Sequence, residues 1–221
     1  GLNLMEIQSL TNRLFRLHAS AIHDVLRQSG YQNFVLPHAI KPISTGQKLA
    51  GPIFTIEGEI TTSHSAHETL IEWTSLLSTI PNNVVAVCQP NTHEVALMGE
   101  LSAETLKKRG ILGYLVDGGC RDISIISELD FPVFHSFKTP KDIVGRWVPT
   151  KLGSPIMIGD CIIKRDDFLL ADQDGSVVIP QEAVEETINK AELVMSSENA
   201  VRKAIMSGID PKEAYLKYGK F

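Results

Sequence analysis

Short apolar runs alternate with helical patterns in the first two thirds of the chain, and this alternation constrains the fold more than any other feature. Val84–Cys88 and Leu112–Val116 are almost entirely apolar, which is typical of strands buried on both faces of a sheet. Apolar residues recur at helical spacing over residues 70–80, and a polar helix is expected over residues 102–109. With further strands expected at 52–62 and 131–137, the pattern predicts an α/β fold with parallel crossovers.

The two ends of the chain have different patterns. Apolar residues between Ile7 and Val25 share one helical face, which predicts a single amphipathic helix that ends at Gly30. After Pro140, short strands joined by turns are expected, and Asp174-Gly175 indicates a hairpin.

Helical sequence follows this region of short strands. A long helix is predicted over residues 181–206, and Asp210-Pro211 is typical of the start of a last, short helix. The sequence contains no internal repeat and no linker. We therefore expect one domain over residues 1–221, with the helices of residues 181–221 as a C-terminal extension.

The composition argues against several classes of protein. A net charge of −5 over 221 residues gives no support for a nucleic-acid-binding protein, which normally has a basic face. No apolar run approaches the length of about 20 residues that a membrane-spanning helix needs. Cys88, Cys120 and Cys161 are far apart and form no CxxC pair, which argues against a disulfide framework or a zinc knuckle. The first residues lack the pattern of a signal peptide, so we expect a cytoplasmic protein.

The pair Arg121-Asp122 is the strongest candidate for a functional site. It follows an expected buried strand and a Gly118-Gly119 turn, a common position for the chemistry of α/β proteins. An arginine can bind a carboxylate through two parallel hydrogen bonds, and an aspartate can bind a hard divalent cation. The simpler alternative is a surface ion pair in which Asp122 caps the following helix.

Other residues near this pair also have structural explanations. Glu100 stands at the expected start of a helix, where the helix dipole favours a carboxylate. Gly99, Gly118 and Gly119 are expected to serve turns that need positive φ. These roles are compatible with a site.

Three further features favour a structural role. His64, His67 and Glu68 share a helical face at a spacing that resembles a metal site, but a polar outer face is the preferred explanation. Cys120 has no histidine close behind it in the sequence, which argues against a thiolate nucleophile. Trp73 is expected to serve in packing or in an interface.

Between Met98 and Pro180 the chain resembles a known family, the 4-hydroxy-4-methyl-2-oxoglutarate aldolases and the related regulator of ribonuclease E activity A. An acidic residue, twenty intervening positions and then Arg-Asp is the signature of that family, and Glu100 and Arg121 have this spacing. Weaker matches cover nearly the whole chain. The sequence departs from the pattern at Ile125, where an acid is usual. The matching segments are Gly99-Glu100-Leu101, Arg109-Gly110, Asp117-Gly118-Gly119-Cys120-Arg121-Asp122, Phe131-Pro132-Val133-Phe134, Gly159-Asp160, Ala171-Asp172-Gln173-Asp174-Gly175 and Val177-Val178-Ile179-Pro180.

The resemblance implies a fold, an assembly and an activity. The implied fold is a swivelling β/β/α, sandwich-like α/β domain, whose C-terminal helices pack on their own or a neighbouring subunit. The implied assembly is a homotrimer or a hexamer with sites at subunit interfaces. The implied activity is a Mg²⁺- or Mn²⁺-dependent lyase that cleaves a small 2-oxo acid to release pyruvate, as a hydroxy-oxoglutarate-type aldolase, an oxaloacetate decarboxylase, or both. The alternative is a non-catalytic protein that binds and regulates a ribonuclease.

The resemblance also implies roles for individual residues. Asp122 would bind the metal directly, while Glu100 and, from a neighbouring subunit, Glu198 would hold the metal through water. Arg121 would hydrogen-bond the keto oxygen or carboxylate of the substrate and stabilise the enolate. Backbone N–H groups of Gly99–Leu101, at the start of a helix, would bind the carboxylate. Water polarised by Glu100 is the favoured general base.

Overall fold

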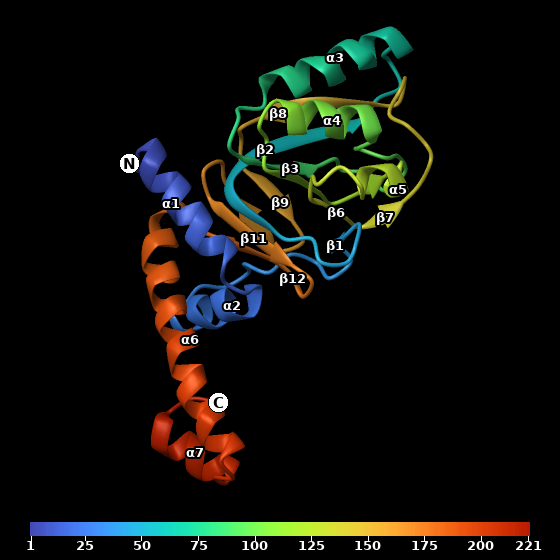
Figure 1. Ribbon diagram of the computed structural model, residues 1–221. Coiled ribbons are helices and arrows are strands. Elements are labelled where there is room, and N and C mark those ends of the chain that lie inside the picture. The colour runs from blue at the N-terminus through green and yellow to red at the C-terminus, as the bar shows by residue number, and fades with distance from the viewer.

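The computed structural model describes residues 1–221 and shows a mixed α/β fold built around one strongly curved sheet (Figure 1). Four parallel strands form its centre in the order β6-β4-β3-β2, as the alternating sequence pattern predicts. Because parallel neighbours need crossover connections, their carboxyl ends lie along one edge of the sheet. The bounds of these strands are β2 (Leu49–Ile60), β3 (Val85–Gln89), β4 (Gly113–Val116) and β6 (Val133–His135).

Antiparallel strands extend the sheet on both sides. The outer edge of β2 is shared, with residues 49–52 paired to β11 and residues 56–60 paired to β8. β11 and β12 form the hairpin expected at Asp174-Gly175. β1 pairs with β6, while β9 pairs with β10 and β5 with β7 in separate two-stranded sheets. The bounds are β1 (Lys41–Pro42), β5 (Gly119–Cys120), β7 (Phe137–Lys138), β8 (Trp147–Leu152), β9 (Ile156–Ile158), β10 (Cys161–Ile163), β11 (Phe168–Asp172) and β12 (Gly175–Ile179).

Alternate residues of the strands enter different cores because successive side chains point to opposite faces of a sheet. Phe54 and Ala86 pack with α3 (Ala66–Thr79) and α4 (Glu100–Lys108), which cover one face. Their neighbours Ile53 and Val85 enter a second core, which the β9–β10 hairpin closes. Burial of each large apolar side chain contributes roughly 1.5–3 kcal/mol to the stability of the fold. The two cores therefore hold the strands in fixed positions, including the strand ends that carry the site.

The single N-terminal helix predicted from residues 7–25 is wrong, because the chain forms two helices, α1 (Leu4–Phe15) and α2 (Ala19–Gln28). Two tertiary contacts stabilise the break between α1 and α2. The ammonium group of Lys48 donates to the carbonyl oxygen of Leu17, and the carboxylate of Asp172 accepts a 2.8 Å hydrogen bond from the N–H of Ala19. The apolar face nevertheless remains continuous, since Leu14, Leu17 and Ile22 are buried in one core.

The C-terminal helices are present as expected. A short 3₁₀ turn, η1 (Gln181–Ala183), leads into α6 (Val184–Met206), which packs on α1 and α2 in its first half and then extends away from the sheet (Figure 1). At its far end lies α7 (Pro211–Tyr218), where Asp210 accepts a hydrogen bond from the N–H of Glu213. None of the helices is both long and apolar enough to span a bilayer.

Candidate active site

Two segments that are distant in the sequence lie side by side at the carboxyl edge of the parallel strands. Ala96 forms a parallel bridge with Gly119, and the N–H of Leu97 donates to the carbonyl oxygen of Gly119 at 2.8 Å. The N–H of Arg121 then donates to the carbonyl oxygen of Met98 at 3.0 Å. This pairing places Gly99–Leu101 next to Arg121-Asp122. The interval between Glu100 and Arg121 is therefore the length of chain needed to make α4, return through β4 and come back alongside the starting point.

Asp122 has a strained backbone and an unexpected partner. Its φ of 56° and ψ of 38° lie in the left-handed region, which aspartate tolerates better than most residues. Asp122 opens α5 (Ile123–Ile126) as expected, but the alternative in which its side chain caps this helix is not observed, because α5 receives no side-chain cap. Instead, Oδ2 accepts a 2.8 Å hydrogen bond from the N–H of Glu100, so the carboxylate lies at the N-terminus of α4. Oδ1 makes no hydrogen bond within the chain.

The glycines around the pair are needed for close approach and not for positive φ, which corrects the prediction. Gly99 has an extended φ of −143°, and Gly118 and Gly119 are not among the residues with positive φ. A Cβ atom on Gly99 would lie 3.0 Å from Asp122 Oδ2 and 3.2 Å from Arg121 Nε. A Cβ atom on Gly119 would lie 2.7 Å from the carbonyl oxygen of Val95. Any larger side chain would push the two segments apart.

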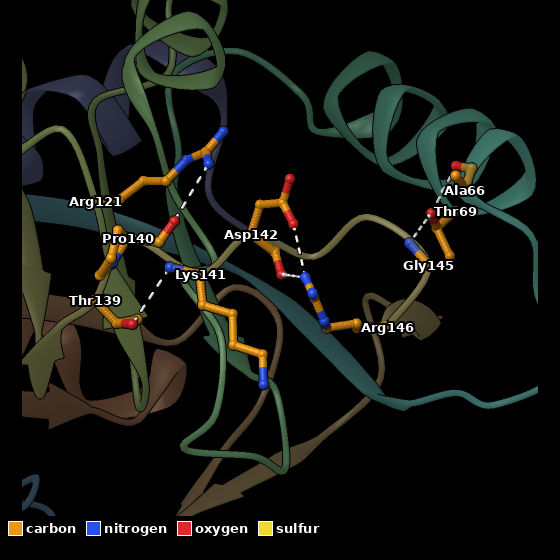
Figure 2. Close-up of polar contacts among 9 residues, drawn as sticks. All are labelled: Ala66, Thr69, Arg121, Thr139, Pro140, Lys141, Asp142, Gly145 and Arg146. Carbon is orange, nitrogen blue, oxygen red and sulfur yellow. Dashed lines mark hydrogen bonds and ion pairs between the residues drawn. The ribbon is translucent and has the colours of Figure 1, made fainter.

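Arg121 is only weakly held by the protein. Its Nε lies 3.9 Å from Asp122 Oδ2, at the outer limit of an ion pair, and its Nη1 donates to the carbonyl oxygen of Pro140 at 3.5 Å (Figure 2). The side chain is 42% exposed. A guanidinium group has five N–H donors, so most of those on Arg121 remain free. These free donors are able to bind an anion.

A cavity of about 530 Å³ opens beside the pair, and we name it the Trp73 pocket. It contains all five residues predicted at the site from this part of the chain, namely Gly99, Glu100, Leu101, Arg121 and Asp122. Its remaining wall comes from α3, from α4, from residues 96 and 98 and from the segment that joins β7 to β8. The apolar members are Leu70, Trp73, Leu77, Ala96, Met98, Ile143 and Val144, and the polar members are Thr74, Ser78, Ser102, Thr105, Arg109 and Asp142.

A second cavity of about 440 Å³ lies on another side of the pair, and we name it the Lys138 pocket. It shares Arg121 and Asp122 with the Trp73 pocket but does not contain Gly99 or Glu100. Its lining residues are Cys120, Arg121, Asp122, Ile123, Lys138, Thr139 and Pro140.

Comparison with known proteins agrees with the motifs. Residues 19–178 match the family model described as RraA-like, Aldolase/RraA. The chain belongs to the RraA-like family. In structure it is similar to RraAS2 of Streptomyces coelicolor, described as an unusual member of the RNase ES inhibitor RraA protein family, with a TM-score of 0.77 and 23% identity over 88% of this chain and 96% of the other. That likeness shows the RraA fold.

Two relatives by sequence differ in how much of their own length the chain covers. It is 28% identical over 225 residues to protein DlpA of Legionella pneumophila, covering 98% of this chain but 35% of DlpA. The chain thus spans about a third of that relative. It is 26% identical over 185 residues to a Halalkalibacterium halodurans protein named "Putative 4-hydroxy-4-methyl-2-oxoglutarate aldolase", covering 82% of this chain and 83% of the other.

The donor atoms of this RraA-like site fit a hard divalent cation that keeps much of its water. No group of three or more His, Cys, Asp or Glu side chains is arranged to bind a metal. Asp122 Oδ1 is free, and the Glu100 side chain makes no hydrogen bond within the chain. Mg²⁺ prefers oxygen ligands and is often held by one or two carboxylates and several waters. Asp122 and Glu100 supply that kind of donor.

Three other residues considered in the sequence analysis have structural roles. Cys120 is fully buried, and burial raises the pKa of its thiol to about 12, which agrees with the prediction that it is not a nucleophile. Glu68 and Ser65 form a capping box at the start of α3, so Glu68 has a structural role. Trp73 packs edge-on against Trp147, with ring centroids 5.9 Å apart, as expected for a packing residue.

Glu198 is not brought to the site by its own chain. It lies in the C-terminal half of α6, where its carboxylate is 3.5 Å from Lys220 Nζ. Its arrival from a neighbouring subunit stays a prediction.

Asp142 and Ile143 were missed by sequence reasoning. They belong to an irregular segment between β7 and β8, and they reach the Trp73 pocket only through tertiary packing. Figure 2 shows this segment, with Asp142 held by Arg146.

Proposed function

We propose that this RraA-like protein is a divalent-metal-dependent lyase that cleaves a small 2-oxo acid and releases pyruvate, by aldol cleavage or by decarboxylation of an oxaloacetate-type substrate. One observation carries the proposal. Arg121, with most of its donors unused, lies beside Asp122, with one free carboxylate oxygen, in a cavity that also contains Glu100 and the start of α4. The name of the Halalkalibacterium halodurans relative supports the aldolase form of the reaction.

The implied cofactor is Mg²⁺ or Mn²⁺. Asp122 would bind it through Oδ1, and Glu100 would hold it through water. When bound, the cation acts as a Lewis acid that withdraws electrons from the 2-oxo acid.

Arg121 and the first turn of α4 bind the substrate. The first N–H groups of a helix have no partner within the helix, and they favour an anion. Since Asp122 occupies the N–H of Glu100, the N–H groups that follow it are left for the substrate carboxylate. Arg121 donates to the keto oxygen, where negative charge grows as the carbon–carbon bond breaks. A preorganised donor of this kind stabilises the transition state more than the bound substrate.

In aldol cleavage of a 4-hydroxy-2-oxo acid, the bond between C3 and C4 breaks. The C4 hydroxyl proton passes through a water to Glu100, and C4 leaves as the carbon of an aldehyde or ketone. The electron pair of the broken bond moves into the pyruvyl fragment, where Arg121 stabilises the charge. A proton added at C3 then gives pyruvate. Decarboxylation differs in that carbon dioxide leaves in place of the carbonyl compound.

The proposed assembly is a homotrimer or a hexamer in which Glu198 reaches the site of a neighbour. The extension of α6 beyond the sheet supports this arrangement. Glu198→Gln and Asp122→Asn variants, each weakly active alone, should regain activity when they are co-expressed, because mixed assemblies contain sites with both native residues. If the mixture stays as inactive as the separate variants, Glu198 does not act across an interface.

The proposed lyase is tested with the purified 221-residue chain, Mg²⁺ or Mn²⁺, and a panel of oxaloacetate and 4-hydroxy-2-oxo acids, with pyruvate as the readout. Chelation of the metal should abolish pyruvate release, and the Asp122→Asn change should lower it strongly. Asp174→Asn is the matched control, since it removes the same charge at the tip of the β11–β12 hairpin. Absence of metal-dependent pyruvate release from every compound would refute the lyase and favour a protein-binding role.

A further inference from the structure

The residues that line the Trp73 pocket beyond Glu100, Arg121 and Asp122 have a chemistry of their own. We propose that the substrate is a 4-hydroxy-2-oxo acid whose far end, beyond C4, is uncharged and apolar, in place of the second carboxylate of a dicarboxylic acid. This inference rests on the proposed function and names the substrate class of the same site.

The position of the far end follows from the placement of the reacting residues. The 2-oxo acid end has to meet Glu100, Arg121 and Asp122 together, and the Trp73 pocket contains all three. The Lys138 pocket lacks Glu100. A substrate held at this end therefore directs its remaining atoms along the Trp73 pocket.

The surface that receives those atoms is largely apolar. Trp73, Leu77, Met98 and Ile143 line it, and each is less than 9% exposed, so their positions are fixed by the core. The polar edge of Trp73 is already occupied, since Nε1–H donates to Ser102 Oγ at 2.9 Å. A pocket of this kind favours an alkyl or aryl group through the hydrophobic effect.

The cations of the pocket, other than Arg121, are held by the protein. Arg109 donates to the carbonyl oxygens of Leu77, Ser78 and Ile80 at 2.5–3.1 Å and closes the C-terminal end of α3. Its guanidinium group is therefore unable to turn towards a ligand without leaving these carbonyl groups, two of them in part-buried hydrogen bonds, unpaired.

Arg146 is held by Asp142 in the same region. Its Nη1 lies 2.9 Å from Asp142 Oδ1 and also donates to the main-chain oxygen of Asp142 at 3.3 Å (Figure 2). Asp142 itself lines the pocket, so its carboxylate repels a second carboxylate on the substrate. A dicarboxylic acid would thus enter without a partner for its far charge.

Binding of acids that the site is unable to cleave tests this preference separately from catalysis. 2-Oxohexanoate and 2-oxoglutarate are similar in size, lack the 4-hydroxyl group, and differ in whether the far end is methyl or carboxylate. Calorimetric titration of the Mg²⁺-loaded protein should show about tenfold tighter binding of 2-oxohexanoate. Equal or tighter binding of 2-oxoglutarate, or binding of neither acid, would overturn the inference.

Two variants locate the cause. Asp142→Asn removes the repelling charge and frees Arg146, so it should strengthen 2-oxoglutarate binding several-fold, roughly the worth of one partly exposed charge pair. The control Asp174→Asn should not alter the ratio. Lys138→Gln should leave the ratio unchanged, and a fall in 2-oxoglutarate binding in that variant would place the far end in the Lys138 pocket and overturn the inference.

Cleavage then separates this inference from the proposed function. 4-Hydroxy-2-oxohexanoate would give pyruvate and propanal, and 4-hydroxy-2-oxoglutarate would give pyruvate and glyoxylate. A higher kcat/KM for the first compound supports the inference, and a higher value for the second overturns it. Tighter binding of 2-oxohexanoate without pyruvate from either compound supports the pocket preference and overturns the lyase.

Discussion

Asp122 and Asp167 accept hydrogen bonds from the start of a helix, yet they lie in opposite environments. Asp167 is 7% exposed, and its two oxygens accept from the N–H groups of Lys164 at 2.8 Å and Gln181 at 3.1 Å. Burial raises the pKa of its carboxyl group. Asp122 is 34% exposed, uses one oxygen and keeps the other free, with a left-handed backbone.

The difference separates a structural carboxylate from a candidate functional one. A fully satisfied carboxylate joins β10, β11 and η1 and has no capacity left for a ligand. Asp122, with one free carboxylate oxygen, is able to bind a cation, and Arg121, with most of its donors free, is able to bind an anion next to it. Strained, incompletely bonded polar groups on a rigid sheet edge are more common at binding sites than in scaffolding.

The largest effect is expected from Arg121→Gln. Loss of a preorganised donor to the growing negative charge should lower kcat about 10²–10³-fold, with little change in the urea midpoint, because Arg121 makes only one long hydrogen bond. Pyruvate release measures the first and circular dichroism in urea the second. Arg202→Gln, on the exposed side of α6, is the matched control. A loss of stability equal to the loss of activity would place Arg121 with Asp167 as a structural residue.

Asp122→Asn should weaken metal binding by about 100-fold. Asparagine keeps an oxygen to accept from the N–H of Glu100 and tolerates the left-handed backbone, so the fold should persist. Titration with Mn²⁺, followed by electron paramagnetic resonance, measures the affinity directly, and Asp174→Asn serves as the control. Unchanged Mn²⁺ affinity in the Asp122 variant would remove Asp122 from the metal site.

Much of the fold could be predicted from the sequence, where local signals were strong. The buried strands, the Asp174-Gly175 hairpin and the Asp210 cap of the last helix depend on neighbouring residues, and the structure confirms them. The break between α1 and α2 depends on Lys48 and Asp172, which are distant in the sequence, so the helical periodicity gave no sign of it.

The candidate site divides in the same way. The spacing between Glu100 and Arg121 pointed to Arg121-Asp122 as a candidate site. The parallel pairing of residues 96–98 with residues 119–121 explains this spacing. The close approach at Gly99 and the contribution of Asp142 and Ile143 arise from tertiary packing. No local pattern carries that information.

Asp167→Ala should lower the stability of the fold and leave the catalytic activity unchanged. It leaves the N–H groups of Lys164 and Gln181 without an acceptor, which should lower the free energy of unfolding by about 2 kcal/mol. Urea denaturation measures the change. Activity per folded molecule should match the native protein, and a selective fall in kcat with unchanged stability would contradict the contrast between the two aspartates.

The smallest expected effect on stability concerns His135. This side chain is buried like that of Asp167, but it has no hydrogen-bond partner. Its side chain is 6% exposed, and neither ring nitrogen makes a hydrogen bond. Burial, assisted by the positive charge of Lys138, lowers the pKa of the imidazole below its ordinary value of 6.5. Below pH 6.5 the unfolded chain therefore binds a proton that the folded chain resists, so stability should fall with pH until the lowered pKa is reached.

His135→Leu should remove that part of the pH dependence and leave stability at pH 8 equal or higher, because no unpaired ring nitrogen remains. Urea midpoints between about pH 5 and 8, bracketing the ordinary histidine pKa, provide the measurement. The control His93→Gln, at a side chain that is 67% exposed, should keep the native pH profile. If the His135 variant also kept the native pH dependence of the urea midpoint, another group would control the sensitivity to acid. The burial of His135 without hydrogen-bond partners would then have no measurable effect on stability.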